Sequence, residues 1–204
     1  MKAALTGGTG AVGTALTRRL RLAGHAVRVL ARPGDPGAEG VRELGAEVRF
    51  GDVQNAADLA GFCEDYEVVY HLAAVILARD ADEYRTVNVE GTRNAVREAK
   101  RAGVRQFVQV SSASVVYAQT TDYSLSKRAG EEIVRASGLS WTIVRPTLVY
   151  APSKGGLEFD LFLSSLRRFP VIPLVGDGSP LKRPVFVEDV IEGVIARSPT
   201  IAAR

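Results

Sequence analysis

The chain has 204 residues, of which 46% are hydrophobic and 24% charged, so its composition is that of an ordinary globular protein with enough apolar residues for a core. The formal net charge is only +3 and the arginines are interspersed with acidic residues, so a nucleic-acid-binding protein is not expected. No apolar run approaches the roughly 20 residues that cross a bilayer, and the expectation is therefore one domain without a membrane span.

The first predicted elements are a strand, a glycine-rich turn and a helix. A short apolar run at residues 3–5 ends in glycines, and residues 11–22 then carry apolar side chains at helical spacing. Gly8, Gly10 and Gly13 have the G-x-G-x-x-G spacing of a dinucleotide-binding turn, whose backbone approaches a pyrophosphate that a side chain would block. N–H groups at the start of the helix would attract the same anion. An ordinary glycine-rich turn is the less favoured alternative, because the flanking strand and helix are those that the motif requires.

A second strand over residues 25–31 ends at Arg32. In dinucleotide-binding folds, an Asp or Glu about 20 residues after the glycines binds the 2′-hydroxyl of the adenosine ribose. The guanidinium of Arg32 at this place would instead suit the 2′-phosphate of NADP. Asp35 is the competing candidate, although it also suits a simple turn role in the PGDPG run. NADP is the expected cofactor, with NAD as the alternative.

The remaining elements alternate between strands and helices, without hairpin dipeptides between them. Strands are expected over residues 47–50, 67–72, 105–110, 140–145, 171–176 and 184–187, and helices over residues 55–63, 82–102, 123–137 and 157–168. This alternation predicts an α/β fold of the Rossmann type, a doubly wound parallel sheet with helices on both faces. Ligands of such sheets bind beyond the carboxyl ends of the strands, which gathers Asp52, residues 71–74 and residues 111–114 around one crevice.

Several residues are assigned structural roles. Cys63 is the only cysteine, so an internal disulfide is excluded, and it is expected to be a buried thiol in a protein of the reducing cytoplasm. His71 is expected to be a hydrogen-bonded strand-end residue rather than a metal ligand, because no second histidine or cysteine pairs with it. Asp80 or Asp82 is expected to cap the long helix, Asp189 to cap a last helix, and Trp141 to lie in the core.

A serine, a tyrosine and a lysine form the candidate catalytic group. Ser112 follows the predicted strand over residues 105–110, and Tyr123 and Lys127 lie four residues apart on one face of the next helix. A phenol is a poor acid or base at neutral pH unless nearby positive charge favours the phenolate, and Lys127 would supply that charge. Ser112 would hydrogen-bond the substrate oxygen and Tyr123 would transfer the proton. Ser111 and Ser114 remain alternatives to Ser112, and a chance YxxxK match is the alternative to the whole group.

The chain resembles the short-chain dehydrogenase/reductase superfamily, in its extended and atypical branch known as the NAD(P)-dependent epimerase/dehydratase family. The motifs that carry the resemblance are TGGTGAVG (6–13), GDV (51–53), HLAA (71–74), NVEGTRN (88–94), SSASVV (111–116), YSLSK (123–127), RPTLVYAP (145–152) and PVFVEDV (184–190). The run RRFPVIPLVGDG (167–178) looks more like atypical members related to a respiratory complex I accessory subunit. Tyr117 stands where many relatives have glycine, and Phe186 stands where sugar-nucleotide epimerases often have histidine. These two departures disfavour a sugar-nucleotide substrate.

The resemblance also implies the site residues. Ser112, Tyr123 and Lys127 would be the catalytic residues, and Asn88 would take the place of the asparagine that supports the family's active site. The cofactor would be bound by Thr6, Gly7, Gly8, Thr9, Gly10, Ala11, Val12, Gly13, Arg32, Asp52, Val53, Leu72, Ala73, Ala74, Tyr123, Lys127 and Pro146. No metal is expected.

Two functions follow from these residues. The first is an NAD(P)(H)-dependent oxidoreductase or epimerase/dehydratase that acts by hydride transfer on a small carbonyl or alcohol substrate, with Tyr123 as acid and base. The second is an NADP(H)-binding redox sensor or assembly protein without turnover. The complete catalytic group favours the first function. The second is favoured because the C-terminal substrate lobe of relatives is short or missing here, with residues 147–187 as a partial substrate-side segment of a single domain over residues 1–204. The sequence leaves truncation or a minimal lid, and a monomer or a homodimer, open.

Overall fold

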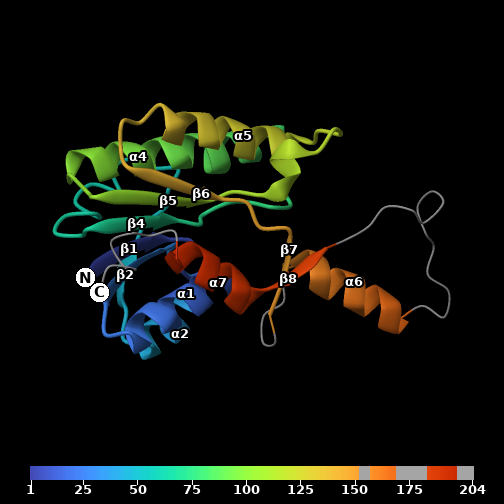
Figure 1. The fold of residues 1–204 in the computed structure, drawn as a ribbon, viewed down its shortest axis with the longest axis horizontal. Helices are drawn as coiled ribbons and strands as arrows, with labels where there is room; N and C mark the ends of the chain where they lie inside the picture. Colours follow the sequence, from blue (N-terminus) through green and yellow to red (C-terminus); the bar gives the residue numbers. More distant parts are fainter. Residues whose placement is uncertain (152–156, 169–182, 197–204) are drawn as a thin grey trace.

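Six parallel strands form the central sheet of the chain, in the order β3-β2-β1-β4-β5-β6 (Figure 1). The computed structural model describes residues 1–151, 157–168 and 183–196. The strands are β1 (Lys2–Thr6), β2 (Ala26–Ala31), β3 (Glu47–Phe50), β4 (Val68–His71), β5 (Gln106–Val110) and β6 (Trp141–Val144). The chain builds outward from β1 in one direction and then returns beside β1 with β4, so the strand order reverses between these two central strands. A ligand crevice of a doubly wound sheet lies at such a reversal.

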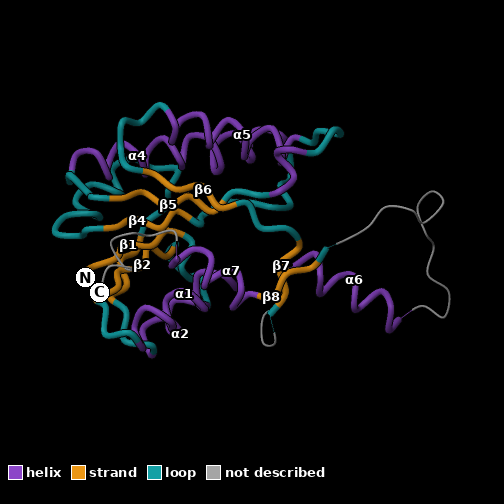
Figure 2. Tube along the Cα trace, in the orientation of Figure 1, coloured by secondary structure: helices purple, strands orange, loops and turns teal. Residues whose placement is uncertain are grey.

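Helices cover both faces of the sheet (Figure 2). On one face lie α1 (Ala11–Leu22), α2 (Gly37–Glu43) and α7 (Val187–Ala196), and α1 packs against α7. On the other face lie α4 (Gly91–Arg101) and α5 (Asp122–Arg135), which pack against each other. Each face has its own apolar core, because the side chains of buried parallel strands point alternately to the two sides. The predicted Rossmann-type doubly wound sheet is confirmed.

A second sheet of two parallel strands lies at the carboxyl side of the central sheet (Figure 1). It pairs β7 (Leu148–Tyr150) with β8 (Pro184–Phe186), and α6 (Leu157–Arg168) lies beside it. The strand expected over residues 171–176 falls outside the described residues. Asp189 lies inside the first turn of α7 rather than at its cap, because the helix already begins at Val187.

The helix expected over residues 82–102 is interrupted by one turn of π-helix. It begins as α3 (Ala81–Tyr84), continues as a π-helical turn over Arg85–Glu90 and becomes α4. Asp80 is its N-cap, and the Asp80 carboxylate accepts a 2.9 Å hydrogen bond from the Glu83 N–H. Such turns are rare and are found mostly at functional sites.

The prediction of a helix over residues 55–63 is wrong. Consecutive turns occupy this segment, with hydrogen bonds such as Phe62 N–H to Leu59 C=O at 2.9 Å. Gly61 and Asp65 have φ angles of 74° and 65°, which a right-handed helix does not allow. At the start of the segment, the Asp58 carboxylate accepts a 2.9 Å hydrogen bond from the Asp52 N–H, which ties the turns to the end of β3.

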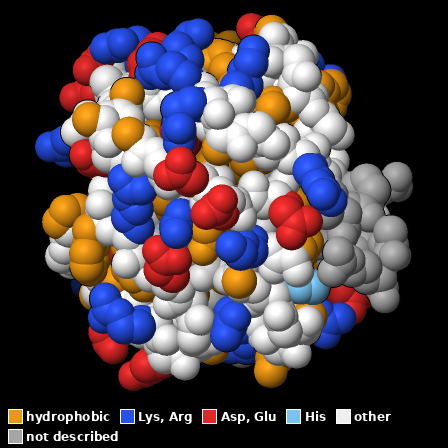
Figure 3. Space-filling model, turned by 90° about the vertical axis from the view of Figure 1, so that its left-hand side faces the viewer, with side chains coloured by type: hydrophobic (Ala, Val, Ile, Leu, Met, Phe, Trp, Pro, Cys, Tyr) orange, Lys and Arg blue, Asp and Glu red, His pale blue; other side chains and the backbone are white. Residues whose placement is uncertain are grey.

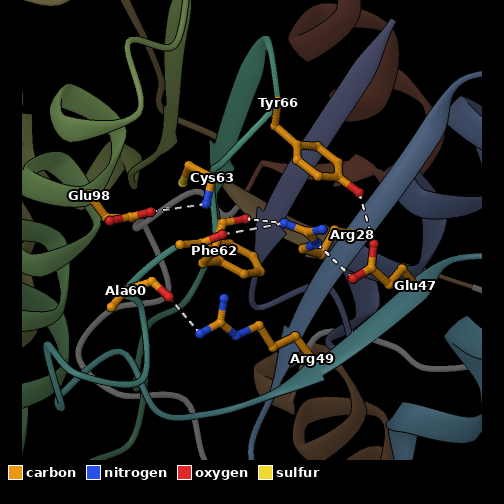
Figure 4. Close-up of polar contacts among 9 residues, drawn as sticks. Arg28, Glu47, Arg49, Ala60, Phe62, Cys63, Tyr66 and Glu98 are labelled. Atoms are coloured by element: carbon orange, nitrogen blue, oxygen red, sulfur yellow. Dashed lines mark hydrogen bonds and ion pairs between the residues drawn. The ribbon is translucent and has the colours of Figure 1, made fainter.

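Arg28 of β2 anchors this turn segment to the sheet (Figure 4). Its guanidinium donates to the Phe62 carbonyl at 3.0 Å, forms a 2.9 Å ion pair with Glu47 and lies 4.4 Å from the centre of the Tyr66 ring. Arg49 of β3 adds a 2.6 Å hydrogen bond to the Ala60 carbonyl. Side chains of two strands therefore hold a segment that has no helical hydrogen-bond ladder of its own.

Trp141 does not lie in the core as expected. Its side chain is 37% exposed, and the guanidinium of Arg135 lies 4.9 Å from the ring centre. Because β6 is an edge strand of the sheet, one side of its first residue is left to solvent.

On the face at which the central strands begin, acidic and basic side chains are intermixed (Figure 3).

We expect Arg28→Met to lower the free energy of unfolding by about 1.5–3 kcal/mol, because hydrogen bonds from a charged donor are lost while their acceptors stay partly buried. Urea denaturation measures this change. Arg42→Met is the matched control, since Arg42 pairs with exposed Glu39 on α2 and should change stability by less than about 0.5 kcal/mol. Equal losses in the two variants would contradict the anchoring role of Arg28.

Candidate functional site

The glycine turn between β1 and α1 packs its backbone against two neighbouring segments. Gly7 has a φ of 70°, and a Cβ there would come within 2.6 Å of the Ala73 nitrogen. A Cβ on Gly13 would come within 2.2 Å of the Gly7 oxygen. These contacts require glycine and bring Leu72 and Ala73, which follow β4, directly beside the turn.

Gly10 differs from the other glycines of the turn. A Cβ there would meet only the Gly7 oxygen, at the ordinary distance of 3.5 Å. Gly10 is also the N-cap of α1, with extended backbone angles and no side-chain cap. The first N–H groups of α1 are therefore not covered by a capping side chain, as an anion-binding helix start requires. The turn fits a dinucleotide pyrophosphate at Gly10.

Thr9 and Asp35 connect the glycine turn to the end of β2. The Thr9 hydroxyl donates to one Asp35 carboxylate oxygen at 2.8 Å, and the Gly37 N–H donates to the other at 2.8 Å. Arg32 begins the same turn, since the Asp35 N–H donates to the Arg32 carbonyl at 3.0 Å, and the Arg32 side chain is exposed. Both candidates for recognition of the adenosine ribose thus lie beside the glycine turn.

Asp52 and Val53 follow β3, and Val53 contacts α4. The Asp52 carboxylate accepts from the Gln54 N–H at 2.9 Å, and the Val53 carbonyl accepts from the Asn94 side chain at 2.8 Å. A Cβ on Gly91 would come within 2.8 Å of the Val53 side chain, so α4 and this connection are in close contact. These two predicted cofactor-binding residues are thereby held at the carboxyl edge of the sheet.

His71 at the end of β4 lies in a buried hydrogen-bond network. Its Nδ1 lies 2.7 Å from the Thr6 hydroxyl and its Nε2 lies 2.9 Å from the Thr92 hydroxyl. The Thr92 hydroxyl donates to the Asn88 carbonyl at 2.7 Å, which assigns the proton to Nε2. Burial and the positive charge of Lys127 lower the pKa of His71 to about 3, so the ring is neutral at pH 7. The expected role of a hydrogen-bonded strand-end residue is confirmed.

Asn88 lies in the π-helical turn and joins two segments of the site. Its side-chain oxygen accepts from the Val75 N–H at 2.8 Å, and its amide nitrogen donates to the Val75 carbonyl at 3.0 Å and to the Ser126 hydroxyl at 2.9 Å. The Ser126 hydroxyl donates in turn to the Tyr123 carbonyl at 2.8 Å. Asn88 therefore positions the connection after β4 and the first turn of α5.

Lys127 lies one helical turn after Tyr123 and points beneath the end of β5. Its ammonium donates to the Val110 carbonyl at 2.9 Å, and the residue is 4% exposed. Burial lowers the pKa of Lys127 to about 8, although the negative charge of Glu131 opposes this effect. The Tyr123 ring is half-buried and lies 6.1 Å from the ring of Tyr84.

Glu131 lies one further turn along α5 and is 2% exposed. Arg145, which follows β6, donates to both Glu131 carboxylate oxygens, at 2.8 and 2.5 Å. Burial acts to raise the pKa of Glu131, but the hydrogen bonds and charge of Arg145 outweigh it, so the pKa lies below its ordinary value. Glu131 is therefore a carboxylate at neutral pH.

The three candidate serines differ in position. Ser111 is buried, at 5% exposure, whereas Ser112 and Ser114 are half-buried. The Ser114 hydroxyl and N–H both donate to the Ser112 hydroxyl oxygen, at 2.9 and 3.2 Å. The Ala113 N–H donates to the Pro146 carbonyl at 2.9 Å. Ser112 and Pro146 thus lie in adjacent segments, and Ser111 is covered by the fold.

Other parts of the described chain offer no competing centre. No group of three or more His, Cys, Asp or Glu side chains that could hold a metal occurs among the described residues. Cys63 is buried, and burial with the charge of Glu98 raises the pKa of its thiol to about 12. A groove of about 860 Å³ between α4 and α5 contains none of the predicted site residues. Within the described part of the chain, no helix has the length and apolarity that spanning a bilayer requires.

Sequence reasoning missed three features of the site. Glu131 could have been found, because it stands four residues after Lys127 and so shares its helix face. The Thr9–Asp35 hydrogen bond and the role of Thr92 have no local signal, because each joins segments 21 or more residues apart.

Comparisons with known proteins agree with this geometry. A model of the NAD dependent epimerase/dehydratase family matches residues 3–200. A ceramide reductase of Caulobacter vibrioides is 36% identical over 200 residues, which cover 97% of this chain and 62% of that protein. A UDP-glucose 4-epimerase of Mycolicibacterium smegmatis is 30% identical over 227 residues, covering 96% of this chain and 72% of that protein. The structure of MoeE5 in complex with UDP-glucose and NAD has a TM-score of 0.80 and 26% identity, covering 95% of this chain and 70% of that one. The chain thus spans less than two thirds of the length of the ceramide reductase.

Proposed function

This chain belongs to the NAD-dependent epimerase/dehydratase family, and from that premise we propose that it is an NAD(P)(H)-dependent enzyme acting on a carbonyl or alcohol substrate by hydride transfer, with Tyr123 as the acid and base. The observation that carries this proposal is the placement of Tyr123 one helical turn from the buried ammonium of Lys127. A nearby positive charge favours the phenolate, which a proton-transferring tyrosine needs at neutral pH.

Each residue of the group then has a role. The cofactor, when bound, supplies the hydride acceptor or donor. The glycine turn and the start of α1 would hold its pyrophosphate, and Leu72, Ala73, Ala74 and Pro146 would line its groove. Ser112 would hydrogen-bond the substrate oxygen, while Tyr123 moves a proton to or from the same oxygen. Asn88 would keep α5 and the connection after β4 in register with each other.

We propose NADP as the preferred cofactor. The exposed guanidinium of Arg32 supports this preference, because it can bind a phosphate through two parallel hydrogen bonds. Asp35 opposes it, since its carboxylate lies in the same turn and would repel a second anion. NAD is therefore expected to bind as well, and these two side chains set the ratio of the NADP and NAD affinities.

We propose an apolar substrate in preference to a sugar nucleotide. Exposed apolar side chains follow both strands that flank the site: Ile76 and Leu77 after β4, and Val116 and Tyr117 after β5. The Ile76 carbonyl accepts from the Tyr84 hydroxyl at 2.9 Å, and the Tyr84 ring contacts Tyr123, which links Ile76 to the site. A ceramide reductase among the relatives supports a lipid-like carbonyl compound, whereas the UDP-glucose 4-epimerase supports the alternative.

We expect Gly10→Val to weaken binding of both NADP and NAD by about tenfold or more. The added side chain would occupy the place of the pyrophosphate, and losing even one charge-assisted hydrogen bond costs about 1.5–3 kcal/mol. Calorimetric titration measures the affinity. Gly40→Val is the matched control, because a Cβ at Gly40 on α2 meets no atom within 4 Å and, like one at Gly10, clashes with nothing. Unchanged affinity in the Gly10 variant would place the pyrophosphate elsewhere.

We expect Arg32→Asp to reduce NADP affinity by about tenfold or more and to leave NAD affinity nearly unchanged, because only NADP carries the 2′-phosphate. Asp35→Asn should raise the NADP affinity relative to the NAD affinity, because it removes a charge that repels the 2′-phosphate. Arg18→Asp makes the same charge change at an exposed position of α1, away from the strand ends. It should alter neither the NADP affinity nor the NAD affinity. Equal loss of both cofactors in the Arg32 variant would refute the assignment.

We expect Tyr123→Phe to lower turnover by about 10²–10⁴ while cofactor affinity hardly changes, because the ring remains and only the proton-transferring atom is lost. One assay follows reduced-cofactor consumption with long-chain ketones. A second follows conversion of a UDP-sugar into its epimer, a reaction with no net consumption of cofactor. Tyr66→Phe is the control, since its hydroxyl bonds Glu47 far along the sheet from this site. Parent-like turnover of the Tyr123 variant would overturn its role. A parent that binds NADP(H) and turns over no substrate would favour the non-catalytic alternative.

A further inference from the structure

Glu131 is a buried carboxylate next to the lysine that the proposed function depends on. Residues four apart on a helix face have Cβ atoms about 5–6 Å apart, so Glu131 lies one turn below Lys127. Glu131 is 2% exposed and Lys127 is 4% exposed, so little water lies near to screen the two charges from each other.

Titratable and polar groups surround Lys127 on three sides. Along α5 lie Tyr123 on one side and Glu131 on the other. From β4, the neutral ring of His71 faces it, and the Val110 carbonyl of β5 accepts its hydrogen bond. Arg145 and Arg135 approach Glu131, at 2.5 and 3.6 Å, on the side of its carboxylate. Of these groups, Glu131 is the one that carries negative charge at neutral pH.

We propose that Glu131 is a positioning residue whose negative charge keeps the buried Lys127 ammonium protonated, and that Arg145 holds the carboxylate in place for this purpose. The inference rests on the proposed function, because a charged Lys127 matters through its effect on Tyr123. Removing the carboxylate leaves burial unopposed, so a neutral amine becomes the favoured form of Lys127 near pH 7.

The fold makes Arg145 suitable for this task. The Arg145 side chain is 36% exposed, so its excess positive charge is partly solvated while its two hydrogen bonds reach the buried carboxylate. A fully buried arginine would add a second desolvated cation beside Lys127, which is costly. Glu131 thus faces one buried cation, Lys127, and two cations that are in contact with water, Arg145 and Arg135.

The direct test is a titration of Lys127 by nuclear magnetic resonance, with lysine labelled at Cε. The sequence has five lysines, and Lys127→Met identifies the signal of interest. We expect Lys127 of the parent to titrate near pH 8, and Glu131→Gln to lower this value by about one to two units. Glu131→Asp keeps the charge and should titrate close to the parent. Glu131→Met, which matches the volume without polar atoms, replaces Glu131→Gln if that variant does not fold.

Glu98→Gln is the matched control. Glu98 is also a helical carboxylate, 5% exposed and paired with an arginine, but it lies on α4 beside the Cys63 N–H. It should lose stability as Glu131→Gln does and leave the Lys127 titration unchanged. An unchanged Lys127 titration in Glu131→Gln, or an equal shift in Glu98→Gln, would overturn the inference.

Turnover gives a second readout. The decline of kcat at high pH should begin about one to two units lower in Glu131→Gln than in the parent, with KM nearly unchanged. If the parent shows no turnover that depends on Tyr123, the proposed function fails, but the titration of Lys127 still decides the inference. If the titration shifts and the kcat profile does not, the inferred effect on Tyr123 is wrong.

Discussion

The close backbone contact between the glycine turn and the chain after β4 is the constraint on which the rest of the site depends. At Gly7 and Gly13 there is no room for a Cβ, so β1, α1 and the β4 connection approach to the distance of bare backbone. This approach brings Leu72 and Ala73 beside the turn at the point where strand order reverses. Larger residues would force these segments apart and widen the crevice that the parallel sheet creates.

One group of buried polar side chains on the α4 and α5 face is hydrogen-bonded, which compensates for its lost contact with water. Thr6, His71, Thr92 and Asn88 form one chain of such bonds, which continues through Ser126 to the backbone of Tyr123. Buried polar groups that lack partners are costly, so a network of this kind allows few alternative arrangements. The end of β1 and the start of α5 are thereby fixed relative to each other, although 117 positions separate Thr6 from Tyr123 in the sequence.

Most of the fold could be predicted from the sequence, because alternating apolar runs and glycine turns are local signals. The bounds of β3, α1 and α6 agree with the expected ranges. The helix predicted over residues 55–63 is wrong although its helical periodicity is real, because Arg28, Arg49 and Glu98 bind the carbonyl and N–H groups of this segment from distant elements (Figure 4). The π-helical turn also escapes prediction, since it is built into a helix whose sequence pattern is ordinary. At the site, Tyr123, Lys127 and the glycines follow from spacing, whereas Asp35 bonding Thr9 requires the folded chain. The roles of these residues, the single-domain division and the likeness to complex I-related members stay predictions.

The small sheet of β7 and β8 joins two parts of the molecule that the central sheet keeps apart. β7 follows Pro146, whose carbonyl is bonded to the Ala113 N–H in the serine segment, while β8 runs directly into α7, which packs on α1 below the glycine turn. The pair is closed by the Tyr150 and Phe186 rings, 5.4 Å apart, and by the Thr147 hydroxyl on the Arg183 carbonyl. The pair therefore connects the segment that contains Ser112 with the helix that packs on α1. Displacement of either strand would strain both of these contacts, so we expect the two faces of the central sheet to move together.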